Sequence, residues 1–188
     1  IYQDKLGYIW VGTQQGVDRF DGYKFKQYSH DIKNDFSRAS GWVIDIQEDE
    51  NGNIWTSDTY GHVAYLNISN DHWENITLLV RDTLLKKNKN LPLRFGTGSS
   101  LYVDNKNKNL WIGSYGTGLI QYEIQNKKFK QFLVHPESDI KFGKQEIVNK
   151  IVGTKDNNLL LSTDIGLQYF NIQNHTFSRL FNSTDSIF

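Results

Sequence analysis

Residues 7–22 read GYIWVGTQQGVDRFDG, and the same order of tryptophan, small residues, glycine and aromatic residue recurs further along the chain. The second copy is GNIWTSDTYGHVAYL at 52–66, and the third is KNLWIGSYGTGLIQY at 108–122. A fourth copy, NNLLLSTDIGLQYF at 157–170, has Leu160 at the tryptophan position. Self-similarity of this kind is the signature of a repeat architecture.

The spacing of the copies indicates which repeat fold the chain adopts. The tryptophan position advances by 45 residues from Trp10 to Trp55, by 56 to Trp111 and by 49 to Leu160. Repeats of this length are typical of β-propeller blades rather than of helical solenoids. An aromatic residue follows the tryptophan position after ten or eleven residues, and we expect these four to be structurally equivalent: Phe20, Tyr65, Tyr122 and Phe170.

Each copy divides into four short strands joined by hairpin-sized turns. In the second copy we expect the strands at 43–48, 54–57, 62–66 and 72–76, and glycines recur where the hairpins need a positive φ. The residue two places after the tryptophan position is small in every copy, which predicts that it admits a large side chain of the next blade. These residues are Gly12, Ser57, Gly113 and Ser162. The sequence therefore predicts an all-β chain of four consecutive four-stranded antiparallel blades.

The composition agrees with a β protein and excludes several functions. Aromatic residues make up 14% of the chain, which favours strands. Lysine plus arginine equals aspartate plus glutamate at 21 each, so no net charge attracts a nucleic acid. The chain has no cysteine, which excludes disulfides and thiolate metal sites, and no apolar run approaches the roughly 18 residues that span a bilayer. Because the chain begins at Ile1 and contains no methionine, we expect it to be a segment of a longer protein.

The four copies are expected to form an open arc of a larger propeller. Few residues precede Asp4, so the innermost strand of the first blade is incomplete, and the eight residues after Leu180 are too few to replace it. The expected boundaries are blade 1 at 1–30, blade 2 at 43–77, a rim insertion at 78–97, blade 3 at 98–133, blade 4 at 147–181 and the start of a link at 182–188. In the insertion, a short helix or an irregular loop is expected around Leu78, Leu79, Leu84 and Leu85. The open faces would be covered by missing blades of the same parent chain, by another copy or by crystal neighbours.

The best-preserved copies carry the pattern Trp, apolar residue, Gly, Thr or Ser, followed by a turn glycine. Trp10-Val11-Gly12-Thr13 with Gly16 shows it, and Trp111-Ile112-Gly113-Ser114 with Gly118 repeats it. This pattern resembles the two-component-regulator propeller repeats of bacterial hybrid histidine kinases of the Bacteroidetes type. The second and fourth copies depart from it at the Gly-Thr and Trp positions.

The resemblance implies both an architecture and a function. Repeats of that family form seven-bladed propellers in the periplasmic part of an inner-membrane protein, commonly a homodimer. The implied function is to sense an oligosaccharide or another small nutrient and to alter a phosphorelay across the membrane. The kinase of such a protein lies outside these residues, so this segment is expected to be non-catalytic.

The loops between the second and third strands are the expected ligand-binding elements, because they vary between copies on a constant framework. The candidate ligand-binding residues are Gln14, Gln15, Thr59, Tyr60, Tyr115, Thr117 and Asp164. Tyr60 and Tyr115 are the candidates for stacking on a sugar ring. The alternative is that both are exposed turn residues without a ligand.

The sequence contains no pattern for a metal, a cofactor or a catalytic group. The acidic run at 48–53 lacks the later glutamate of a calcium loop, and we interpret it as a hairpin turn. The five histidines have no repeated spacing to a carboxylate. Two other functions remain open: a propeller enzyme such as a polysaccharide lyase or glycoside hydrolase, and a non-catalytic scaffold for protein interactions.

Overall fold

The computed structural model describes residues 1–29, 42–77, 96–135 and 146–180. Blade 1 consists of β1 (Tyr2–Gln3), β2 (Ile9–Thr13), β3 (Gly16–Phe20) and β4 (Phe25–Ser29). Blade 2 consists of β5 (Val43–Glu48), β6 (Ile54–Asp58), β7 (Val63–Asn67) and β8 (His72–Asn75). Blade 3 consists of β9 (Gly96–Asp104), β10 (Asn109–Tyr115), β11 (Gly118–Glu123) and β12 (Lys128–Phe132). Blade 4 consists of β13 (Val148–Gly153), β14 (Leu159–Thr163), β15 (Gly166–Asn171) and β16 (Thr176–Arg179).

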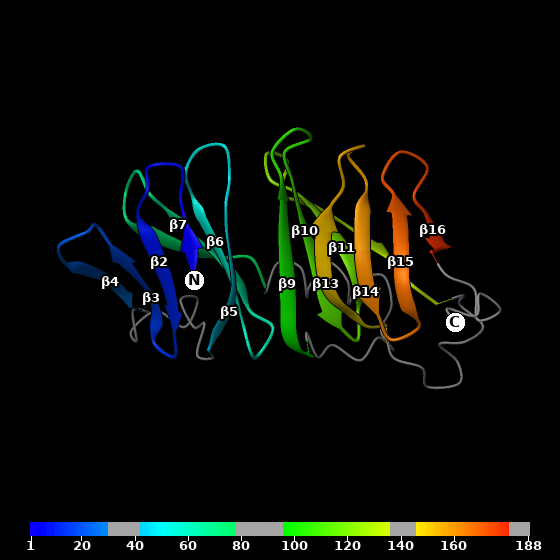
Figure 1. Cartoon of the computed structure of the whole chain (residues 1–188), viewed down its shortest axis with the longest axis horizontal. Helices are drawn as coiled ribbons and strands as arrows, with labels where there is room; N and C mark the ends of the chain where they lie inside the picture. The colour runs from blue at the N-terminus through cyan, green and yellow to red at the C-terminus, as the bar shows by residue number, and fades with distance from the viewer. Residues whose placement is uncertain (30–41, 78–95, 136–145, 181–188) are drawn as a thin grey trace, which may run out of the picture.

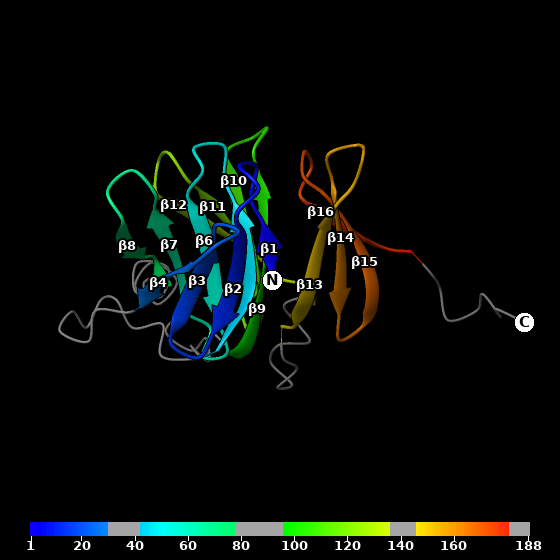
Figure 2. The same cartoon turned by 60° about the vertical axis from the view of Figure 1, so that its left-hand side comes forward.

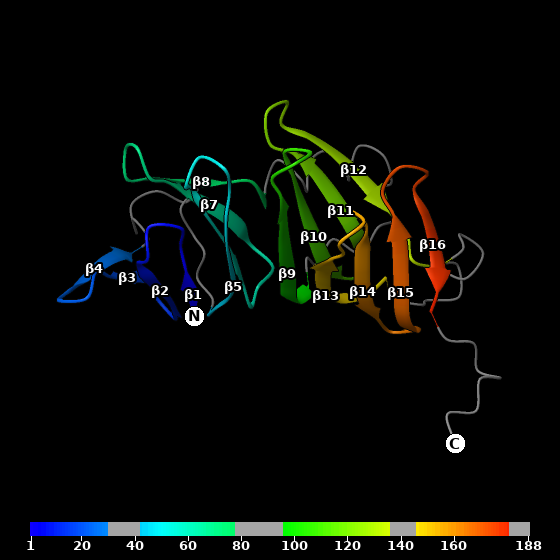
Figure 3. The same cartoon turned by 45° about the horizontal axis from the view of Figure 1, so that its top comes forward.

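Each blade is one antiparallel sheet in which consecutive strands are neighbours. Figure 1 shows the blades in chain order, and Figure 3 shows them splayed like a fan, with β1, β5, β9 and β13 as the inner strands. Blade 4 lies at one end of the row (Figure 2). The predicted fold class is confirmed: the chain is all-β and forms part of a propeller.

An aspartate closes the first hairpin of blades 1 and 2 and also binds the tryptophan. Asp49 Oδ1 accepts hydrogen bonds from the backbone N–H groups of Asn51 and Asn53, at 2.9 and 3.0 Å, and its Oδ2 accepts Trp55 Nε1–H at 3.0 Å. Asp4 binds Trp10 Nε1 in the same way at 2.7 Å. The carboxylate therefore fixes the turn and the indole together, six residues apart in the sequence.

Blades 3 and 4 lack this clamp for two different reasons. In blade 3 the hairpin has one more residue, so Asp104 bonds to Asn107 and, among the described residues, the buried Trp111 Nε1–H makes no hydrogen bond. In blade 4 both partners are replaced, since Thr154 stands at the aspartate position and Leu160 at the tryptophan position. Thr154 Oγ1 still accepts the backbone N–H of residue 158 at 3.0 Å and closes the turn.

Two of the four small residues after the tryptophan position, Gly12 and Gly113, are seats for a side chain of the next blade, as the sequence predicted. A Cβ on Gly12 would lie 2.9 Å from Val43 Cβ, and a Cβ on Gly113 would lie 2.7 Å from Val148 Cγ1. The repeat tryptophans Trp10, Trp55 and Trp111 are fully buried. The propeller core therefore lies between the blades, where a large ring and a glycine on one sheet face apolar residues of the next.

The equivalence proposed for the second aromatic residue is wrong in blade 2. Phe20 pairs with the residue before the tryptophan of its own blade, as do the aromatics of blades 3 and 4. Tyr65 instead pairs with Trp55 itself, and Leu66 takes the place that corresponds to Phe20. The turn between the second and third strands is one residue longer in blade 2 than in blade 1. The spacing from the tryptophan to the aromatic residue is therefore ten in both blades, although the strand pairing differs by one residue.

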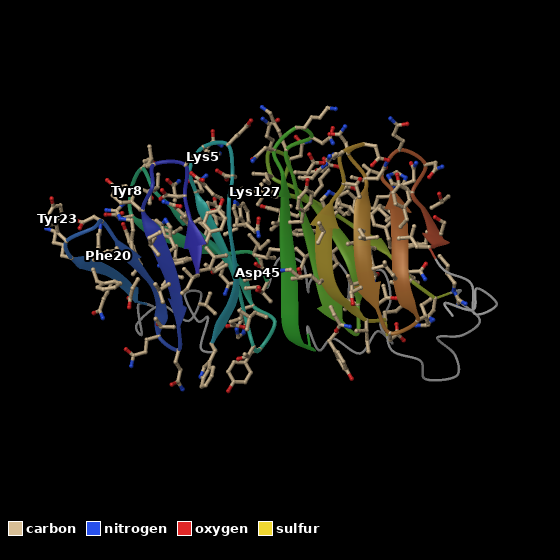
Figure 4. The ribbon with its side chains drawn as sticks, in the orientation of Figure 1. Lys5, Tyr8, Phe20, Tyr23, Asp45 and Lys127 are labelled. Carbon is tan, nitrogen blue, oxygen red and sulfur yellow. The ribbon has the colours of Figure 1, made fainter. Side chains whose placement is uncertain are left out.

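A polar ladder joins three blades along the inner strands. Asp45 on β5 points towards β9 (Figure 4), and its Oδ2 accepts Leu101 N–H at 3.0 Å and the Ser100 hydroxyl at 3.3 Å. Ser100 Oγ in turn accepts Ile151 N–H of blade 4 at 3.2 Å. Lys150 Nζ reaches back over one blade to Asp45 at 2.9 Å. Side chains on one blade thus satisfy backbone donors of the next.

Parts of the predicted organisation lie outside the described residues. These are the helix or loop around Leu78, Leu79, Leu84 and Leu85, most of the rim insertion and the link at 182–188. Within the described part of the chain, no helix has the length and apolar character needed to cross a membrane.

Candidate ligand-binding rim

The loops of the second hairpins lie along one edge of the arc. Figure 1 shows the β2–β3, β6–β7 and β14–β15 loops at the lower edge, opposite the loops of the first hairpins. This edge, here called the rim, carries all the ligand-binding residues predicted from the sequence. Each loop is closed by a residue at or next to the end of its second strand, namely Thr13, Asp58, Ser114 or Thr163.

The blade 2 loop is held rigidly by a buried carboxylate. Asp58 Oδ1 accepts the backbone N–H groups of Tyr60 and His62 at 2.8 and 2.9 Å, and its Oδ2 lies 2.7 Å from His62 Nδ1. With Nδ1 against the carboxylate, Nε2 is the ring nitrogen left for another hydrogen-bond partner. This loop holds the Tyr60 side chain outwards, where the residue is 62% exposed, with its ring centroid 6.3 Å from that of His62.

Trp42 lies beside this loop and was missed by the sequence reasoning. Its backbone pairs with Thr59, since Thr59 N–H donates to the Trp42 carbonyl at 3.0 Å and Trp42 N–H donates to Thr59 Oγ1 at 3.2 Å. Trp42 is 63% exposed although tryptophan is among the most apolar side chains. A signal was present in the sequence, because Trp42 belongs to none of the four repeat copies.

The blade 3 loop presents Tyr115 and buries Thr117. Ser114 Oγ accepts Thr117 N–H at 3.1 Å, donates to the Gly118 carbonyl at 3.2 Å and contacts the Thr117 hydroxyl. The Thr117 carbonyl also accepts Gln131 Nε2–H at 2.9 Å. Thr117 therefore shapes the loop from inside, while Tyr115 is 40% exposed.

Asp164 of blade 4 is bound to a buried histidine. Its Oδ2 lies 2.8 Å from Nε2 of His135, which follows the outer strand of blade 3. Glu146 lies at the same junction, where its carboxylate accepts the backbone N–H groups of Val134 at 2.5 Å and His135 at 3.1 Å. Burial raises the pKa of the Glu146 carboxyl, and the two backbone donors act against that rise. This cluster joins blade 3 to blade 4.

Gln14 and Gln15 lie at the other end of the rim, on the two-residue turn of blade 1. Both side chains are exposed, and they line a shallow hollow with Thr13, Asp18 and Gln27. The structure thus distributes the predicted residues over four blades. It places Thr59 and Tyr60 beside Trp42, and it places the other predicted residues on the neighbouring loops of the same edge.

Within the described residues, no group of three or more His, Asp or Glu side chains could hold a metal ion. Hydrogen-bond acceptors, donors and exposed aromatic faces are the chemistry that the rim offers. These groups suit the capture of a small polar molecule that also has apolar faces.

Comparison with known proteins identifies the class of fold. No family model matches the chain. The extracellular domains of the hybrid two-component systems BT4673 and BT3049 of B. thetaiotaomicron superpose with TM-scores of 0.64 and 0.68 at 20% and 22% identity. Virginiamycin B lyase from Staphylococcus aureus superposes with a TM-score of 0.68 at 12% identity. These likenesses show that the chain has the β-propeller fold.

Coverage shows how the chain relates in length to these proteins. Each alignment with the two extracellular domains includes 94% of this chain, but only 20% and 22% of the domains. The lyase alignment includes 98% of this chain and 55% of the enzyme. A stretch of 28 residues is 57% identical to Histidine kinase P4 of Formosa agariphila. This stretch makes up 15% of this chain and 2% of that protein. The chain therefore spans about a fifth of the similar extracellular domains.

Proposed function

We propose that the chain is part of the extracytoplasmic sensor of a hybrid two-component histidine kinase and that its rim binds a small nutrient such as an oligosaccharide. The repeat pattern and the likeness to two extracellular sensor-system domains support the class. The short match to a histidine kinase supports it from the sequence. In this proposal the segment is periplasmic, belongs to a homodimeric inner-membrane protein with further blades, and binds its ligand without turnover.

The observation that carries the ligand proposal is the aromatic pair of blade 2. Trp42 and Tyr60 are both more than 60% exposed and are joined through the backbone of Thr59. Flat rings on a fixed backbone bind the apolar faces of a ligand with little loss of side-chain entropy. Pyranose rings combine such faces with hydroxyl groups at their edges. Nε2 of His62, next to Tyr60, supplies a hydrogen-bonding group for those hydroxyls, which can both donate and accept.

In this proposal, the other predicted residues either contact the ligand directly or support a loop that does. Tyr115 adds a second aromatic surface on the neighbouring blade, and Gln14 and Gln15 offer amide groups further along the rim. Asp164 bonds to His135 through Oδ2, and its Oδ1 accepts no hydrogen bond from the described residues. Thr117 acts indirectly, because it is buried and supports the Tyr115 loop.

Calorimetric titration of the chain with a panel of oligosaccharides tests the proposal. For any saccharide that binds, Trp42→Ala and Tyr60→Ala should each weaken the affinity by about tenfold, since an aromatic contact contributes about 1–2 kcal/mol. Tyr23→Ala is the matched control, because Tyr23 is 96% exposed but lies at the outer end of blade 1 (Figure 4). Equal losses in all three variants would refute the rim site, and release of a cleaved product would favour a propeller enzyme.

A further inference from the structure

A polar hollow opens on blade 3 beside the β9–β10 and β11–β12 turns, at the edge opposite the rim (Figure 1). Its volume is about 200 Å³. Most of the residues that line it are asparagine or glutamine, namely Asn107, Asn109, Gln121, Gln125 and Asn126. In the part of the chain that the structure describes, no aromatic side chain lines it. The hollow therefore offers amide groups rather than ring faces.

Asn109 is buried in the wall of this hollow without a partner for its side chain. The residue is only 6% exposed, and its side-chain amide makes no hydrogen bond to any described residue. The equivalent asparagine of blade 2, Asn53, uses both ends of its amide. Its Nδ2 donates to Asp49 Oδ2 at 3.0 Å, and its Oδ1 accepts the backbone N–H of residue 68 at 3.4 Å. An unpaired buried amide costs free energy, which a ligand that bonds to it would recover.

Two features of blade 3 explain why this amide is left without a partner. The first is that Asp104 bonds within its own turn, so its carboxylate does not take the part of Asp49. The second is the residue that pairs with the tryptophan position on the third strand, which is tyrosine in blades 2 and 4 but Gln121 in blade 3. In blade 4 the hydroxyl of this tyrosine, Tyr169, accepts Asn158 Nδ2–H at 2.7 Å. The shorter Gln121 leaves both the space and the amide open.

The charged groups of the hollow already have partners. Lys108 Nζ lies 3.2 Å from Glu50 Oε1, and Glu123 Oε2 accepts a hydrogen bond from Asn126 Nδ2 at 2.9 Å. One lysine and one glutamate in the lining leave no net charge to select an ion. The unpaired amides hold a donor and an acceptor side by side, which matches hydroxyl groups on neighbouring carbon atoms.

We propose that this hollow is a second binding site, which takes a neutral polyhydroxyl molecule of the size of one sugar unit and holds it through the Asn109 amide. The volume sets the size, since sites for drug-sized ligands have about 300–1,000 Å³. Recognition is through hydroxyl groups, because the lining has amides in place of rings. The site lies at the opposite edge from Trp42 and Tyr60, so it acts independently of a ligand at the rim.

NMR titration of the chain with glucose, galactose and mannose tests this site, because side-chain amide signals report on it directly. At least one of these sugars should shift the amide signals of Asn109, Gln121 and Gln125. The expected Kd is about 1–10 mM, since a small polar ligand in an open hollow makes few contacts. Glucuronate and glucosamine, titrated in the same way, should bind no more tightly than the neutral sugars.

Two variants separate binding from folding. Asn109→Ala should weaken the affinity by about tenfold, because two hydrogen bonds to the ligand are lost. It should not lower the melting temperature, because the amide has no partner in the described residues. Gln121→Tyr restores the residue of blades 2 and 4 and should abolish binding while the chain stays folded, since the ring fills the hollow and its hydroxyl can pair with Asn109.

Gln173→Ala is the matched control, because Gln173 occupies the same place in the Ile-Gln-Asn sequence of blade 4 as Gln125 does in blade 3. It should leave the affinity within about twofold of the wild type. An absence of amide shifts with all three neutral sugars would overturn the proposal, as would binding that survives Gln121→Tyr. Shifts confined to the Tyr60 loop would place sugar binding at the rim alone. Tighter binding of glucuronate or glucosamine would show that charge, and not the amides, selects the ligand.

Discussion

Replacing Gly113 by serine should destabilise the junction of blades 3 and 4, and replacing Val148 by glycine in the same chain should recover part of the loss. A Cβ on Gly113 would lie 2.7 Å from Val148 Cγ1 and 2.8 Å from the Val148 carbonyl oxygen. The carbonyl belongs to strand β13 and cannot move without disturbing the sheet. Overpacking of this kind costs about 1–3 kcal/mol of unfolding free energy.

The second half of the exchange has its own cost. Val148 is fully buried, so Val148→Gly alone should lower the unfolding free energy by about 2–4 kcal/mol through a cavity and a more flexible strand. Together the two changes remove the Val148 side chain that a Cβ at position 113 would otherwise meet. We therefore expect the double variant to be more stable than the sum of the single losses by about 0.5–3 kcal/mol.

Urea unfolding followed by tryptophan fluorescence and circular dichroism measures these differences, with the midpoints compared at constant slope. Ser162→Ala is the control, because Ser162 occupies the same repeat position in blade 4 but is exposed. This change should alter the unfolding free energy by less than about 0.5 kcal/mol. If the single losses simply add in the double variant, size complementarity is not what holds the two blades together.

Three further predictions concern the hairpin clamp and the blade 3 junction. Asp49→Ala should lower the unfolding free energy by about 2–4 kcal/mol in urea titrations, because several donors including Trp55 Nε1–H lose their acceptor; a loss below about 0.5 kcal/mol would contradict this. Deleting Lys106 gives Asp104 and Trp111 the six-residue spacing of blades 1 and 2, so that the carboxylate can accept Trp111 Nε1–H. The melting temperature should therefore rise, and a fall would refute this reasoning. The raised pKa of Glu146 means that its contribution to the unfolding free energy is fully present below the normal pKa of 4.5 and is lost as the pH rises through the raised value. The wild type should therefore lose stability relative to Glu146→Gln as the pH rises above about 4.5 in urea titrations, and a pH-independent difference would refute this.

The sequence was sufficient for the fold because each blade repeats one packing solution. A large apolar residue, a small residue and a turn glycine recur in every copy, so the pattern of Trp10 and Gly12 could be recognised without knowing any contact. The seats for Val43 and Val148 followed from size alone. The register of Tyr65 did not follow, because a longer turn can keep the spacing to an aromatic residue constant while the strand pairing shifts by one.

The rim was predicted less completely, since its chemistry depends on contacts between distant residues. Variation between copies led to Tyr60 and Tyr115, which the structure shows exposed, but it could not reveal that Thr117 points inwards. The bond from Asp164 to His135 joins residues 29 positions apart on different blades. Trp42 could not be predicted from the repeats, because it occupies a position that has no counterpart in the quoted copies.

Because Trp111 lacks the hydrogen bond to a turn aspartate, the junction of blades 3 and 4 is the expected site of first separation under load. In blades 1 and 2 the indole is bonded to its own turn while it packs on the next blade, so the turn and the seam must open together. The seam between blades 3 and 4 has the ring contact with Phe170 but no such bond from the indole among the described residues. Under mechanical load, or in a pulling experiment between the two ends of the chain, β13–β16 should be the first sheet to detach.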